Sequence, residues 1–120
     1  MSERVHFQAD EDLDKDIVTG LRRRETSIAF DIIPTHGLPK GTLDPAVLAF
    51  AAGQGRVLVS HDLKTMTQHF AAFLASGQHS AGLILVPRKL PIAQVIAELY
   101  LIWEATTPDY WRDLIQYLPL

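Results

Sequence analysis

The stretch Arg56-Val57-Leu58-Val59-Ser60-His61-Asp62 decides the fold class of this chain. Its centre is a short, continuous apolar run without the polar alternation of a half-exposed strand. Such a run is expected for a strand that is covered on both faces, as in parallel sheets flanked by helices. His61 and an acid, Asp62, follow the strand, so Asp62 is expected at the edge of the sheet where the strand ends.

Strand-like and helical segments alternate on both sides of this run. Four strands are expected, at Arg4–Ala9, Ile28–Ile33, Arg56–Ser60 and Gly82–Val86. Helices are expected from Asp12 to Arg24, from Asp44 to Gly53, from Met66 to near Gly77, from Ile92 to Trp103 and from Asp109 to Leu118. The stretch Thr35 to Thr42 is expected to be a loop. This order predicts a three-layer α/β/α domain with a mostly parallel sheet of about four strands.

The composition fits one domain over residues 1–120. The chain is 48% hydrophobic, carries a net charge of −3 and has no cysteine. Disulfides, thiolate metal sites and cysteine nucleophiles are therefore excluded, and a reducing cytoplasm is favoured. The first residues are too few and too charged to form a signal peptide. No apolar run approaches the roughly 20 residues of a membrane span, so no membrane partner is expected.

Three acids from distant parts of the sequence are expected to converge. Ligands of open α/β sheets bind beyond the carboxyl ends of the strands. Asp10 follows the first strand, Asp62 follows the third, and Asp44 opens the helix that leads into the third. Glu11 or Asp12 would join them.

A cluster of carboxylates is costly, because like charges repel one another and raise one another's pKa. A divalent cation removes this conflict, and oxygen ligands without thiolates select Mg²⁺ or Mn²⁺. Such an ion supports hydrolysis of phosphodiesters. Each acid also has a structural interpretation: Asp44 before Pro45 and Asp62 after Ser60 are both suitable helix caps. Asp12 is expected to cap the first helix, with later acids on its solvated face.

A calcium-binding loop is a third interpretation of the acids that begin at Asp10, and it fails on spacing. An EF-hand loop needs glycine at its sixth position and glutamate at its twelfth. Counted from Asp10, these positions hold Lys15 and Leu21.

Four segments together resemble a known family. They are Ala9-Asp10-Glu11-Asp12-Leu13, Asp44 followed by Val47-Leu48-Ala49, the run Arg56 to Asp62, and Gly82-Leu83-Ile84-Leu85-Val86. Their order and spacing, over roughly residues 5 to 105, are similar to those of PIN-like proteins of the DUF5615 type. These are predicted nucleases often found as toxin–antitoxin components.

The resemblance implies a metal-dependent endoribonuclease acting as the toxin of a type II toxin–antitoxin system. Asp10, Asp44 and Asp62 would hold Mg²⁺ or Mn²⁺, Glu11 would assist them, and Ser60 would support the strand end. RNA would be the substrate, and a cognate antitoxin protein the partner. Family members commonly continue after the last acid as D-x-D-F, whereas this chain has Lys64 at the second acid.

That lysine would contact substrate phosphate. Two further cations, Arg88 and Lys89, follow the fourth strand and are the preferred basic contacts on the same edge. The loss of the acid also keeps open a PIN-like protein without catalysis that serves as a binding module. The aromatic C-terminus, with Tyr110 and Tyr117, is a candidate surface for a homodimer or an antitoxin.

A receiver-like phosphoacceptor domain is the alternative from another class. Asp10-Glu11, Asp62 and Lys89-Leu90-Pro91 imitate its acidic pair, its phosphoacceptor and its late lysine. Two observations count against it: four strands are expected rather than five, and no serine or threonine follows the fourth strand.

Overall fold

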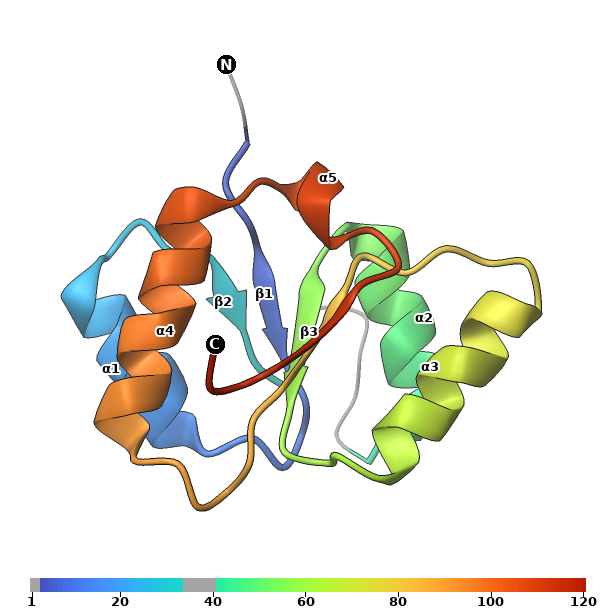
Figure 1. The fold of residues 1–120 in the computed structure, drawn as a ribbon, viewed down its shortest axis with the longest axis horizontal. Coiled ribbons are helices and arrows are strands. Elements are labelled where there is room, and N and C mark those ends of the chain that lie inside the picture. Colours follow the sequence, from blue (N-terminus) through green and yellow to red (C-terminus); the bar gives the residue numbers. More distant parts are fainter. Residues whose placement is uncertain (1–2, 34–40) are drawn as a thin grey trace.

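A computed structural model describes residues 3–33 and 41–120 of the chain. Strands and helices alternate along it, and two helices precede the last strand (Figure 1). The strands are β1 (Phe7–Ala9), β2 (Phe30–Asp31), β3 (Val57–Ser60), β4 (Leu83–Leu85) and β5 (Ile115–Tyr117). The helices are α1 (Lys15–Arg24), α2 (Asp44–Gln54), α3 (Thr65–Ala75), α4 (Ile92–Ala105) and α5 (Pro108–Trp111). Most of the loop expected at Thr35 to Thr42 lies outside the described residues.

All five strands are parallel and lie in the order β2-β1-β3-β4-β5. Helices α1 and α4 pack together on one side of the sheet, and α2 and α3 on the other (Figure 1). The predicted α/β/α architecture is confirmed, with the Rossmann-like or PIN-like alternation of parallel strands and helices. Because all strands run the same way, their carboxyl ends share one edge, which is at the bottom in Figure 1.

The number of strands was predicted wrongly, since the segment Asp109 to Leu118 is not one helix. Its apolar residues Trp111, Leu114, Ile115 and Leu118 follow a helical spacing, which is why the sequence favoured a helix. Instead the four-residue α5 ends at Trp111, Asp113 adopts a left-handed φ of 60°, and the chain continues as β5 beside β4. The pairing with β4 satisfies more backbone groups than a short, isolated helix would.

Strand β3 divides the core as its sequence predicted. Val57 and Val59 belong to one apolar cluster, with residues of α1 and α4, and Leu58 belongs to another, with residues of α2 and α3. All three side chains are buried. Helices therefore cover both faces of β3, and this explains why its sequence lacks polar alternation.

Two predicted helix caps are corrected by the structure. The side chain that caps α1 is Asp14, which accepts the N–H of Asp16 at 2.9 Å, and not Asp12. The cap residue of α2 is Leu43, whose side chain makes no capping bond, while Asp44 lies in the first turn. The carboxylate of Asp44 is therefore not consumed by capping.

Gly82 brings two backbones into contact at the start of β4. It has a φ of 112°, and a Cβ built there would lie 2.7 Å from the carbonyl oxygen of Trp111. Only glycine fits a position with this backbone angle and this clearance. The close approach seats the buried Trp111 against β4 and so sets where β5 begins.

In the two described ranges, no helix combines the length and the apolar character needed to cross a bilayer.

Candidate functional site

Asp10 is the most buried acid at the carboxyl edge, with only 7% of its surface exposed. It directly follows β1, and its own N–H donates to the carbonyl of Val59 in β3 at 2.9 Å. One carboxylate oxygen, Oδ1, accepts the N–H of Glu11 at 2.9 Å, and Oδ2 accepts the hydroxyl of Ser60 at 2.7 Å. These bonds fix the orientation of the carboxylate.

Burial raises the pKa of Asp10 above its ordinary value of 3.8, and the charges of Asp44 and Asp12 raise it further. The two hydrogen bonds act in the opposite direction but do not cancel the effect of burial. Because the charge of Asp44 is among the causes, the two carboxylates influence each other across the edge. A proton or a cation between them would relieve this repulsion.

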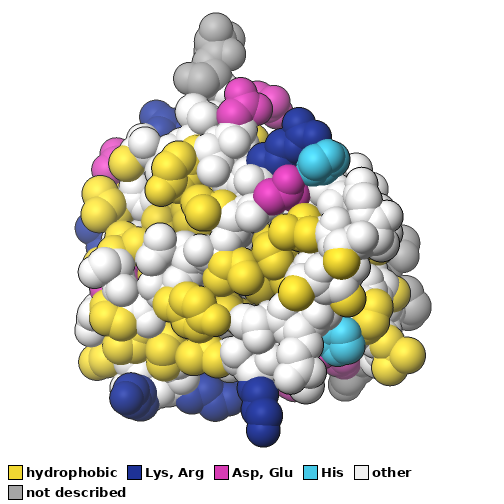
Figure 2. Space-filling view, turned by 45° about the vertical axis from the view of Figure 1, so that its right-hand side comes forward, with side chains coloured by type: hydrophobic (Ala, Val, Ile, Leu, Met, Phe, Trp, Pro, Cys, Tyr) yellow, Lys and Arg dark blue, Asp and Glu magenta, His cyan; other side chains and the backbone are white. Residues whose placement is uncertain are grey.

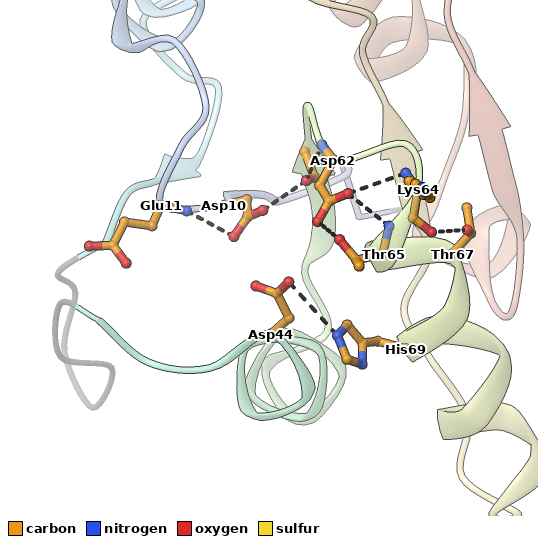
Figure 3. Close-up of polar contacts among 9 residues, drawn as sticks. Asp10, Glu11, Asp44, Asp62, Lys64, Thr65, Thr67 and His69 are labelled. Carbon is orange, nitrogen blue, oxygen red and sulfur yellow. Dashed lines mark hydrogen bonds and ion pairs between the residues drawn. The ribbon is translucent and has the colours of Figure 1, made fainter.

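Asp44 points from the first turn of α2 toward the space between Asp10 and Asp62 (Figure 3). Asp10, Asp44 and Asp62, from three separate segments, therefore lie at the same edge of the sheet (Figure 3). His69 of α3 joins them, with its Nε2 4.0 Å from Oδ2 of Asp44. Sequence reasoning missed His69, because only the packing of α3 against α2 brings it to the site.

Asp62 lies at the same edge, but its carboxylate caps α3. Its oxygens accept the N–H groups of Thr65 at 2.9 Å and Lys64 at 3.2 Å, and also the hydroxyl of Thr65 (Figure 3). The hydroxyl bond is the main cause that lowers the pKa of Asp62. This is the structural interpretation that the sequence left open. To bind a metal ion directly, Asp62 would have to exchange part of this cap.

Ser60 connects the two strand-end acids. Its hydroxyl donates to Asp10 and accepts the N–H of Asp62 at 3.0 Å, while its side chain is completely buried. Ser60 therefore supports the site from beneath, and a buried side chain of this kind is not placed to contact a large substrate.

Glu11 is turned away from Asp10 (Figure 3). Its two carboxylate oxygens lie 3.1 and 3.2 Å from the backbone nitrogen of Gly41, which donates to them. Glu11 thus attaches the chain that enters α2 to the end of β1. This contact is consistent with an indirect role for Glu11, through the position of Asp44.

Three exposed cations lie at the carboxyl edge. Lys64 directly precedes α3, and Arg88 and Lys89 follow β4. Arg88 crosses to the other side of the site, where its Nη2 donates to the carbonyl of Asp12 at 3.3 Å. In Figure 2, Lys and Arg side chains gather along the lower border, which is the side to which the strands point in Figure 1.

His61 connects two segments of the chain at the carboxyl edge. Its Nδ1 lies 2.8 Å from the carbonyl of Val86, and its Nε2 accepts the N–H of Asp14 at 3.2 Å. The ring therefore donates through Nδ1. Its role as a bridge between the end of β4 and the start of α1 was not predicted from the sequence.

The donor set at the edge is oxygen-rich but open. Within residues 3–33 and 41–120, no group of three or more His, Cys, Asp or Glu side chains is gathered closely enough to enclose a metal ion. Mg²⁺ commonly binds through one or two carboxylates, keeps several waters and adds substrate phosphates. Asp10 and Asp44 fit that mode of binding, in which the protein supplies few ligands.

Comparisons with known proteins do not assign a function to this chain. No family model, no curated protein and no solved structure matches the chain.

Proposed function

We propose that this protein is a metal-dependent endoribonuclease of the PIN-like type, and that Asp10 and Asp44 hold Mg²⁺ or Mn²⁺. The observation that carries the proposal is the buried Asp10 carboxylate, whose pKa is raised by burial and by the charge of Asp44. Repulsion between Asp10 and Asp44 costs folding free energy, and a divalent cation bound between the two carboxylates would remove this cost.

The residues around these acids have complementary tasks. Hydrogen bonds from the hydroxyl of Ser60 and the N–H of Glu11 hold the Asp10 carboxylate in one orientation. The side chain therefore loses little rotational freedom when a ligand binds. Asp62 fixes the start of α3, which carries His69 and is directly preceded by Lys64. A bound divalent ion supplies a water of lowered pKa and neutralises charge at the scissile phosphate.

The exposed cations provide the contacts for nucleic acid. Lys64, Arg88 and Lys89 border the acids and can neutralise phosphates on either side of the cut. These three cations offset the net charge of −3 only near the acids. The affinity for RNA is therefore expected to fall steeply as the salt concentration rises. The resemblance to the PIN-like family extends the proposal to a toxin that is neutralised by a cognate antitoxin.

The test is cleavage of a fluorescent single-stranded RNA with Mn²⁺, Mg²⁺ or EDTA. Wild type is compared with Asp10→Asn, Asp44→Asn and Asp62→Asn, and with Asp16→Asn as the matched control on the exposed side of α1. Losses of at least about a hundredfold are expected for Asp10→Asn and Asp44→Asn, and a smaller loss for Asp62→Asn. Equal cleavage by wild type and Asp10→Asn would refute the proposal.

Growth of cells expressing the protein tests the toxin part separately. Wild type should arrest growth and Asp10→Asn should not. Metal-dependent cleavage without growth arrest would support the proposed nuclease activity and contradict the proposed role as a toxin.

A receiver-like phosphoacceptor is the second candidate, because one argument against it has failed. The sheet has five strands in the order 2-1-3-4-5, which is the flavodoxin-like order. The other argument stands, since Val86 is followed by Pro87 and Arg88 rather than by serine or threonine. A stable acyl phosphate on Asp62 after incubation with acetyl phosphate would favour this candidate.

A further inference from the structure

Strand β5 forms one edge of the sheet, and within the described residues no strand pairs with its outer side. In the ladder with β4, Leu83 donates to the carbonyl of Leu114, and Leu118 donates to the carbonyl of Leu85, both at 2.9 Å. Backbone groups alternate along a strand, so those of Gln116 also face β4, and those of Ile115 and Tyr117 face outward. The carbonyl of Tyr117 accepts the side-chain amide of its neighbour Gln116 at 2.8 Å.

Exposed apolar side chains lie around this edge. Leu101, Tyr110, Tyr117 and Leu120 each expose about half of their surface, from 49% to 58%. A hollow of about 180 Å³ lies between α4, α5 and the C-terminal residues, and no charged residue lines it. Figure 2 shows hydrophobic side chains gathered on the face of the molecule that includes the last, red segment of Figure 1.

The two edge strands, β2 and β5, differ in how well they are protected against pairing with a further strand. At the opposite edge, β2 has two residues, and its Asp31 pairs with His6 at 2.5 Å and with Arg56 at 3.4 Å. Short strands and charges are the usual means of preventing edge pairing. Strand β5 has three residues, Ile115 to Tyr117, and none is charged.

We propose that two copies of this protein associate through β5, antiparallel, about a two-fold axis at Gln116. The occupant is a second copy, because an uncharged edge brings no like charges together when it meets itself, and an antiparallel pair of identical strands is self-complementary. The sheets of the two copies then form one continuous sheet. This inference does not depend on the proposed nuclease activity.

The register follows from the outward groups. With the axis at Gln116, Ile115 of each copy faces Tyr117 of the other, and each pair exchanges two bonds, about four in total. With the axis at Tyr117, Ile115 would face Pro119, which has no N–H. With the axis at Ile115, Tyr117 would face Asp113, whose N–H already donates to Ser80 at 3.2 Å.

Charges also agree with this register. Asp113, the acid nearest to β5, faces Pro119 of the second copy, so no carboxylate meets a carboxylate. The Gln116 side chains of the two copies meet at the axis, where each can exchange its bond to Tyr117 for a bond across the interface.

A single cysteine tests the axis directly, because the native chain contains none. Residues at a non-hydrogen-bonded antiparallel pair have Cα atoms about 4.5 Å apart, within the range for a disulfide. In a glutathione buffer, Gln116→Cys is expected to form a covalent dimer. The control is Leu43→Cys, outside β5, at a site that is more accessible than Gln116, since Leu43 is 77% exposed. Equal cross-linking of the two variants would overturn the proposed axis.

Sedimentation over a range of concentrations tests the association itself. Wild type is expected to show a monomer–dimer equilibrium, and Tyr117→Pro is expected to raise the dissociation constant about ten- to a hundredfold. The proline removes an N–H that faces outward, which an edge strand tolerates. Wild type that stays monomeric at every concentration overturns the proposal, as does a dimer of unchanged affinity in Tyr117→Pro. If that variant does not fold, slower exchange of the Ile115 and Tyr117 amides at high wild-type concentration serves as the measurement, and unchanged exchange counts against the interface.

Discussion

The hydroxyl of Ser60 donates to Oδ2 of Asp10 across 2.7 Å, and this bond joins the ends of two neighbouring strands inside the protein. It is one of the two bonds that lower the pKa of Asp10 against the effect of burial. Ser60 therefore keeps Asp10 ionised more readily than its burial alone would allow.

Ser60→Ala is expected to lower cleavage activity and to shift its onset to higher pH. Without the hydroxyl, the pKa of Asp10 rises further, so a higher pH is needed to ionise it. The measurement is the pH profile of the initial cleavage rate, with Ser27→Ala as the control, because Ser27 is exposed and its hydroxyl donates to Glu25 instead of Asp10. An unchanged profile would mean that ionisation of Asp10 does not limit the reaction.

Asp10→Asn is expected to stabilise the metal-free protein at neutral pH while abolishing cleavage. The pKa of Asp10 is higher in the folded state, so the folded protein binds this proton more tightly than the unfolded chain does. This tighter proton binding stabilises the folded state below the ordinary pKa of 3.8. The stabilisation is lost as the pH rises through the raised pKa of Asp10 in the folded protein. The variant should melt at a higher temperature than wild type at pH 7, and this advantage should disappear below pH 3.8.

Calorimetric scans with added Mg²⁺ complete this comparison. The ion should raise the melting temperature of wild type by binding the folded state. Asp10→Asn should respond much less. An equal response of both proteins would place the ion elsewhere.

Thr65→Val is expected to destabilise the protein by about 1 kcal/mol, in the usual range for losing part of a helix cap. The variant keeps the shape of the side chain and removes the hydroxyl that Asp62 accepts. The pKa of Asp62 should then rise toward its ordinary value, since this bond is the first cause that lowers it. Urea unfolding gives the free energy, and NMR titration of the Asp62 carboxyl carbon gives the pKa. A matched Thr19→Val variant on the exposed side of α1 should change neither.

His61→Phe is expected to cost about 2 kcal/mol of folding free energy. A phenyl ring fills a similar space but satisfies neither the carbonyl of Val86 nor the N–H of Asp14. Denaturant unfolding measures the loss, and amide exchange at Asp14 should accelerate in the variant. Stability equal to wild type would show that water replaces both bonds without cost.

Much of the fold could be predicted, because the strands covered on both faces are apolar throughout and the helices repeat their apolar residues every three or four positions. β5 could not be predicted, because Trp111, Leu114, Ile115 and Leu118 have helical spacing, and only pairing with β4 decides otherwise. For the same reason the sequence could place three acids at one edge but could not assign their contacts. Whether Asp62 binds a ligand or caps α3 depends on the rotamer of one side chain beside Thr65.

His69 shows the remaining limit. Nothing around it in the sequence marks it, and it is near Asp44 only because α2 and α3 lie side by side. A residue of this kind becomes a candidate only when the tertiary structure is known.

Gly82 has a consequence for how tolerance to substitution should be interpreted across this chain. Its backbone lies too close to the carbonyl of Trp111 to admit any side chain. In a library of all single substitutions selected for activity, position 82 should therefore be as invariant as position 10. Yet Gly82 directly precedes the amino end of β4, whereas Asp10 follows the carboxyl end of β1. Its invariance would therefore report a spacing between two backbones and not a step in the chemistry.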